Sequence, residues 1–75
     1  MKMTYIIIEM QTNNGVTAVV PPVSYANENQ AEAAYHTALA AAAVSSVQEH
    51  AVSMLKDSGE LVKKECYYHF NEAAV

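Results

Sequence analysis

Gln30-Ala-Glu-Ala-Ala-Tyr-His-Thr-Ala-Leu-Ala-Ala-Ala-Ala-Val44 is the stretch that decides the fold of this 75-residue chain. Alanine has the highest helix propensity of all residues, so the stretch predicts one helix, over residues 28–44. Its small side chains allow the helix backbone to lie close to a neighbouring sheet or helix. Asn27 has the polar side chain preferred at a helix N-cap, and Gln30 follows three residues later. We therefore expect a helix that begins after Asn27 and packs through its alanines.

Two β-strands are predicted before this helix, over residues 4–11 and 16–20. They are rich in β-branched residues and are separated by Asn14-Gly15, a dipeptide typical of tight hairpin turns. Pro21-Pro22 follows the second strand. Because proline has no N–H to donate to a strand ladder, we expect this pair to end the strand.

Two further strands are predicted after the helix, over residues 47–55 and 61–70, with a turn at Ser58-Gly59. A tight turn there pairs residues whose numbers sum to 117, which places His50 opposite Tyr67. The whole chain, residues 1–75, is then one domain of the α+β class, with the order β-β-α-β-β. Two hairpins form an antiparallel sheet, and the helix covers one of its faces.

The alternation of side chains along each strand predicts which residues face the helix. For the second hairpin the less polar face is expected to pack against the helix; it carries Ala51, Leu55, Val62, Cys66 and Phe70. For the first strand we expect Ile6, Ile8 and Met10 to do so, which leaves Tyr5 and Ile7 on the uncovered face. Uncovered apolar side chains on a small protein typically mark an interface. We therefore expect a homodimer or a higher oligomer.

A polar and aromatic cluster is predicted on the uncovered face of the second hairpin. It consists of Gln48, His50, Glu65, Tyr67 and His69. Such side chains can hydrogen-bond a base or a sugar, and the aromatic rings can stack on one. Tyr25 and Asn27, close to the helix N-terminus, form a second candidate ligand site, because backbone amides there can hold a phosphate. The alternative is that the cluster consists of ordinary solvated residues or of hydrogen bonds across an oligomer contact.

Composition excludes several classes of partner. The net charge is −4, with four lysines and no arginine, so direct nucleic-acid binding is not expected. No apolar run approaches the ~18 residues of a membrane span, and the apolar run near the N-terminus is too short for a signal peptide. The single cysteine agrees with a reducing compartment. We expect a cytoplasmic protein.

Metal binding and catalysis are not expected either. Cys66 and His69 lie three residues apart, so a regular strand places the thiol and the imidazole on opposite faces. No nucleophile with a neighbouring base can be assigned in the sequence. The sequence therefore predicts a non-enzymatic protein without a metal or cofactor.

Several segments resemble a family of small uncharacterised proteins encoded by phages and prophages, and the similarity covers nearly the whole chain. They are Ile8-Glu-Met-Gln-Thr12, Ala31-Glu-Ala-Ala-Tyr-His36, Leu39-Ala-Ala-Ala-Ala-Val-Ser45, His50 and Glu65-Cys-Tyr67. The family carries no established activity; the resemblance implies a phage setting in the host-cell cytoplasm. There we expect an anti-defence sponge, an oligomer that sequesters a nucleotide-derived immune signal. The alternative is a protein–protein inhibitor of a host defence enzyme, or a small structural or interaction protein.

Overall fold

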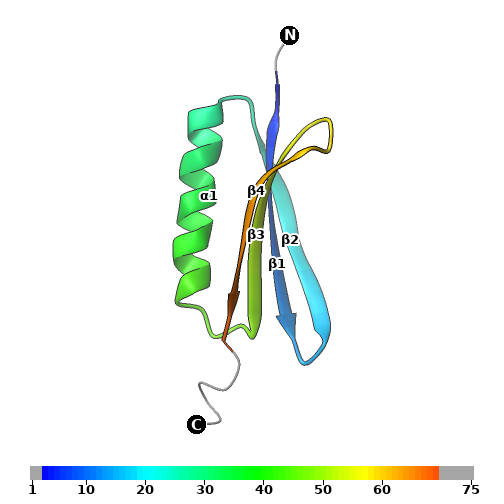
Figure 1. The fold of residues 1–75 in the computed structure, drawn as a ribbon, viewed down its shortest axis with the longest axis vertical. Coiled ribbons are helices and arrows are strands. Elements are labelled where there is room, and N and C mark those ends of the chain that lie inside the picture. Colours follow the sequence, from blue (N-terminus) through cyan, green and yellow to red (C-terminus); the bar gives the residue numbers. More distant parts are fainter. Residues whose placement is uncertain (1–2, 70–75) are drawn as a thin grey trace.

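The computed structural model describes residues 3–69 of the chain. It confirms the predicted α+β class and the order β-β-α-β-β (Figure 1). The elements are β1 (Tyr5–Asn13), β2 (Val16–Tyr25), α1 (Glu28–Ala43), β3 (Glu49–Lys56) and β4 (Leu61–Tyr68). The predicted last strand extended to Phe70, which lies outside the described residues.

The four strands form one antiparallel sheet in the order β2-β1-β3-β4. The first strand of each hairpin therefore lies in the centre, and the second strand of each lies at an edge. The helix α1 runs along one face of this sheet, and within residues 3–69 no helix lies over the other face (Figure 1).

The β1–β2 hairpin turns at the predicted dipeptide. Asn14 and Gly15 both have positive φ angles, 52° and 80°. A two-residue turn that matches the twist of its strands needs positive φ at both central positions. Asparagine and glycine tolerate this conformation best, which explains why the turn forms here.

The prediction that Pro21-Pro22 ends the second strand was wrong, because β2 continues through both prolines to Tyr25. Between the pairs Ile7↔Val23 and Glu9↔Val20 the register shifts, so the two prolines lie opposite a single residue of β1. Proline is tolerated at a bulge and on an edge strand, where a missing N–H breaks no ladder. Both conditions hold in β2.

The helix begins as predicted and ends one residue earlier, at Ala43. The Asn27 side chain accepts hydrogen bonds from the backbone N–H groups of Asn29, at 2.8 Å, and Gln30, at 3.2 Å. Two of the N–H groups that a helix N-terminus leaves unpaired are thereby satisfied.

The β3–β4 register is also as predicted, with His50 opposite Tyr67 and Val52 opposite Glu65. The turn itself differs. Leu55 pairs with Leu61 rather than with residue 62, and Gly59 has a φ of 95°, so the loop is one residue longer than the predicted tight turn. A register shift next to Met54 then restores the predicted pairing along the rest of the hairpin.

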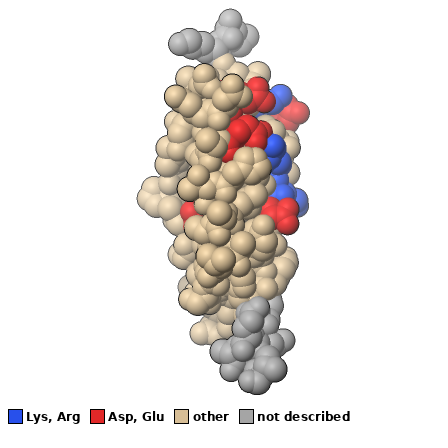
Figure 2. Space-filling model, turned by 90° about the vertical axis from the view of Figure 1, so that its left-hand side faces the viewer, with Lys and Arg blue, Asp and Glu red and all other residues tan. Residues whose placement is uncertain are grey.

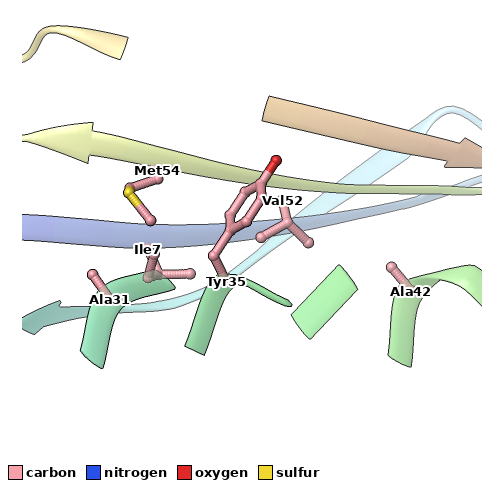
Figure 3. Close-up of a cluster of buried hydrophobic side chains, with 6 residues drawn as sticks. All are labelled: Ile7, Ala31, Tyr35, Ala42, Val52 and Met54. Atoms are coloured by element: carbon pink, nitrogen blue, oxygen red, sulfur yellow. The ribbon is translucent and has the colours of Figure 1, made fainter. Parts of the chain in front are cut away.

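The core lies between α1 and the sheet (Figure 3). Its buried members are Ile7, Ala31, Tyr35, Ala42, Val52 and Met54. Ala31 and Ala42 have no exposed surface, which agrees with a helix that packs closely through its alanines. The large side chains come from the sheet and from Tyr35, whose ring reaches from α1 toward β3 and β4 (Figure 3).

The predicted assignment of the two sheet faces was wrong. Ile7 of β1 and the alternating residues His50, Val52 and Met54 of β3 are buried beneath the helix. Ile6 and Ile8 therefore lie on the face that α1 does not cover, which we call the open face. An alanine-rich helix contributes little side-chain volume to the core. The sheet face with the bulkier side chains therefore fills the space beneath it.

Among the described residues, the open face carries those predicted for the core, with one exception; Phe70, also predicted for the core, lies outside the described residues. Its central residues are Ile6, Ile8, Met10, Ala51, Leu55 and Cys66. Val62 packs against the core instead, because it is the extra residue in the register shift of β4. The expectation of an uncovered apolar face is met, with Ile6 and Ile8 in place of Tyr5 and Ile7.

Candidate functional site

A network of hydrogen bonds lies beneath the C-terminal end of α1. His50 is 3% exposed, and both of its ring nitrogens have partners. Nε2 contacts the carboxylate of Glu9 on β1, and Nδ1 lies 2.9 Å from the hydroxyl of Ser45, which follows the helix. These hydrogen bonds thus connect the centre of the sheet to the α1–β3 loop.

One arrangement of the protons satisfies every hydrogen bond of this network. The Ser45 hydroxyl accepts from the backbone N–H of Val47 at 3.3 Å, so its proton can be donated to Nδ1 of His50. The Nε2–H of the imidazole then donates to Glu9, which also accepts from Gln11 at 3.3 Å. Among the described residues no buried side-chain nitrogen or oxygen lacks a hydrogen-bond partner.

Ser45, His50 and Glu9 are the residue types of a hydrolytic triad; here they join the loop after α1 to β3 and β1. The imidazole is buried, and the serine oxygen is held by a backbone N–H, whereas a nucleophile must reach a substrate. Sequence reasoning found His50 but missed Glu9 and Ser45. The signal was the carboxylate of Glu9 within an apolar strand, since a buried acid needs a partner.

Gln48 and His69 lie at the end of the sheet, where they hold loops in place. Gln48 donates its backbone N–H to the Asn13 side chain at 3.0 Å, and its own side chain accepts from the Asn14 backbone at 2.8 Å. The His69 ring lies 3.0 Å from the carbonyl oxygen of Ala42, near the helix C-terminus. The backbone of His69 also donates to Gln48 at 2.7 Å.

Tyr67 and Glu65 follow the same face of β4, beneath the edge of the helix. Tyr67 is half-buried and packs against the core, whereas Glu65 is exposed. The cluster was predicted on the uncovered face, but the structure places it on the helix side. His50 and Tyr67 are neighbours there, as the register predicted. A site on this face would have to open the helix–sheet contact to reach His50.

The second predicted site, near the helix N-terminus, is held by local contacts. Tyr25 lies opposite Tyr5 and packs against the core. The Asn27 side chain is occupied by its two capping hydrogen bonds. Both residues thus have structural roles at the start of α1.

A charged edge lies where α1 passes β4. Lys63 donates to Glu32 at 2.7 Å, and its ammonium lies 5.7 Å from the centre of the Tyr35 ring. The hydrogen bond from Lys63 holds the pKa of Glu32 below its ordinary value, and burial raises the pKa of Tyr35. Figure 2 shows charged side chains gathered along this edge and a largely uncharged surface over the rest of the helix side.

A hollow of about 430 Å³ lies on the open face, over β3 and β4. Its lining consists of Met10, Ala51, Ser53, Lys64, Glu65, Cys66 and Tyr68. Tyr68 is 62% exposed, and its hydrogen bond with Cys66 raises the pKa of the phenol. Sequence reasoning missed this hollow, because it assigned Ala51 and Cys66 to the core.

Within residues 3–69 no three metal-ligating side chains come together, and no helix has both the length and the apolar character needed to cross a membrane. No family model, curated protein or solved structure matches the chain. The resemblance to small phage proteins stays a prediction.

Proposed function

We propose that this protein is a non-enzymatic binding protein that works as a homodimer formed through its open sheet face. The observation that carries the proposal is the apolar character of that face. Within the described part of the chain, no helix or second sheet lies over Ile6, Ile8 and Met10 in β1 or over Leu55 in β3. A sheet with two apolar faces is typically covered on both.

The size of the open face supports a second copy as its cover. Four strands spaced ~4.8 Å apart and about nine residues long, at ~3.3 Å per residue, cover roughly 570 Å² as a flat area. The relief of the side chains adds to this value. Stable dimers bury at least about 600 Å² on each partner, so the open face has the size that such an interface needs.

The non-enzymatic character is supported by the state of the buried histidine. His50 is 3% exposed beneath α1, so a substrate cannot reach its imidazole without moving the helix. In the phage setting that the resemblance implies, the proposed homodimer would bind a nucleotide-derived immune signal and thereby act against a host defence.

Light scattering coupled to size-exclusion chromatography tests the dimer. At micromolar concentration we expect a mass of twice the 8.2 kDa chain. Val19→Lys and Ile8→Lys place a charge on the open face and should give monomers with an unchanged circular dichroism spectrum. Val16→Lys is the matched control, because Val16 lies at the hairpin end and pairs with Asn13, off that face. A wild-type monomer would overturn the proposal.

The alternative is an inhibitor or interaction protein that covers another protein with the same face. The net charge of −4 favours a basic partner surface. The alternative predicts a monomer, so the same mass measurement separates the two functions.

A further inference from the structure

We propose that the hollow on the open face binds a small planar aromatic anion, such as a nucleoside monophosphate, and that a second copy of the chain completes the site. The inference rests on the proposed homodimer and deepens it by naming the site and the chemistry of its occupant. The residues that carry it are Tyr68, Lys64 and Ser53.

The side chains of the hollow alternate along one face of β4. In the register of the hairpin, Lys64 lies opposite Ser53, Cys66 opposite Ala51, and Tyr68 near the end of the strand. Lys64 and Tyr68 lie four positions apart along the strand, a rise of about 13 Å. A nucleobase stacked near Tyr68 can therefore extend a phosphate toward the lysine.

The lining of the hollow offers a matching residue for each chemical group of such a molecule. The exposed ring of Tyr68 offers a stacking surface, and Met10, Ala51 and Cys66 form an apolar floor. Ser53 adds a hydroxyl that donates or accepts.

Lys64 supplies the positive charge. Lys56 pairs with Glu60 and Lys63 with Glu32, whereas within residues 3–69 Lys64 forms no ion pair. Glu65 contributes to the lining of the hollow although strand alternation places its side chain on the helix side of β4, and the chain carries a net charge of −4. One lysine in an acidic protein suits a monophosphate better than a polyphosphate.

The volume of about 430 Å³ lies within the range of small-molecule sites, but one wall of the hollow is open to solvent. Ligand sites usually bury most of the bound molecule. A second copy packed on the open face closes the hollow. Because a two-fold interface uses the same patch twice, the partner brings its own Tyr68 and Lys64 to this interface.

Isothermal titration calorimetry with three probes tests the site: adenosine 5′-monophosphate, adenosine and inorganic phosphate. We expect the monophosphate to bind most tightly. Tyr68→Ala should weaken its binding roughly five- to a hundredfold, as loss of one stacking contact does. Lys64→Gln should weaken the monophosphate and leave adenosine unchanged. Lys56→Gln, which makes the same charge change beside the β3–β4 turn, is the control and should bind as the wild type does.

The mass of each variant, measured in the same buffer, separates this inference from the proposed dimer. A wild-type dimer that binds none of the probes at millimolar concentration overturns the site and leaves the dimer. Unchanged affinity in both Tyr68→Ala and Lys64→Gln does the same. Tight binding to the monomeric Val19→Lys variant overturns the role of the second copy. Loss of binding in that monomer supports it.

Discussion

Glu9 and His50 are hydrogen-bonded beneath the helix, although 41 residues separate them in the chain. Each side chain supplies the hydrogen-bond partner that the other needs. A carboxylate in a central strand and an imidazole under a helix are both unfavourable when they are buried without a partner. Paired, and continued to Ser45, they fasten the α1–β3 loop to the sheet.

His50→Leu should destabilise the fold by about 1–3 kcal/mol, because it removes the shared partner of Glu9 and Ser45, which are both partly buried. Glu9→Gln should cost less, since the amide oxygen still accepts from the imidazole. Urea denaturation measures both. In a double-mutant cycle, His50→Leu with Glu9→Leu should be less harmful than the sum of the two single changes. Strict additivity would show that the pair is not coupled.

Ala42→Leu should destabilise the protein by about 1–3 kcal/mol through overpacking, because Ala42 has no exposed surface beneath the helix. The half-buried Ala38 should respond in the same direction. Ala41→Leu is the matched control, since Ala41 is exposed and such changes typically stay within about 0.5 kcal/mol. Equal denaturation midpoints for Ala41→Leu and Ala42→Leu would contradict the close helix–sheet packing.

The Glu32–Lys63 hydrogen bond should make stability depend on pH in the acid range. The pKa of Glu32 in the fold lies below its ordinary value of 4.5, so the stabilisation is fully present above that pH. It is lost as the pH falls through the folded-state pKa. Glu32→Gln should therefore flatten the fall in thermal midpoint below pH 4.5.

Glu60→Gln serves as the control for this pH dependence. The Glu60 contact with Lys56 is 3.6 Å long and its side chain is 67% exposed, so it contributes little. An acid profile that Glu60→Gln changes as much as Glu32→Gln does would contradict a special role for the Lys63 contact.

Replacing both prolines of β2 with valine should promote aggregation. β2 is an edge strand whose exposed valines include Val19 and Val23, and Pro21-Pro22 removes two N–H groups and bends the edge at a bulge. The valine variant restores both donors on an apolar edge. Turbidity after incubation at 37 °C measures the effect; the double lysine variant restores the same donors with added charge and should stay clear. Turbidity in neither variant would show that the prolines do not protect the edge.

The sequence by itself determined the local elements of this protein. Asn14-Gly15 formed the first turn and Asn27 capped the helix. Both depend on contacts between residues close in the chain, where backbone preferences dominate. The predicted pairing of His50 with Tyr67 was kept because a register shift next to Met54 offset a turn one residue longer than predicted. The α+β class followed from the order of such elements.

Only the tertiary structure decided which sheet face meets the helix. Alternation shows which residues share a face, but both faces of β1 carry isoleucine, so periodicity could not choose between Ile7 and Ile8. The choice depends on how well side chains fill the space under an alanine helix, and on His50 finding Glu9 across the sheet. Because this face of the sheet meets the helix, the predicted polar cluster lies under the helix and the hollow at Tyr68 lies on the open face. Both outcomes depend on residues far apart in the chain, which no local pattern connects.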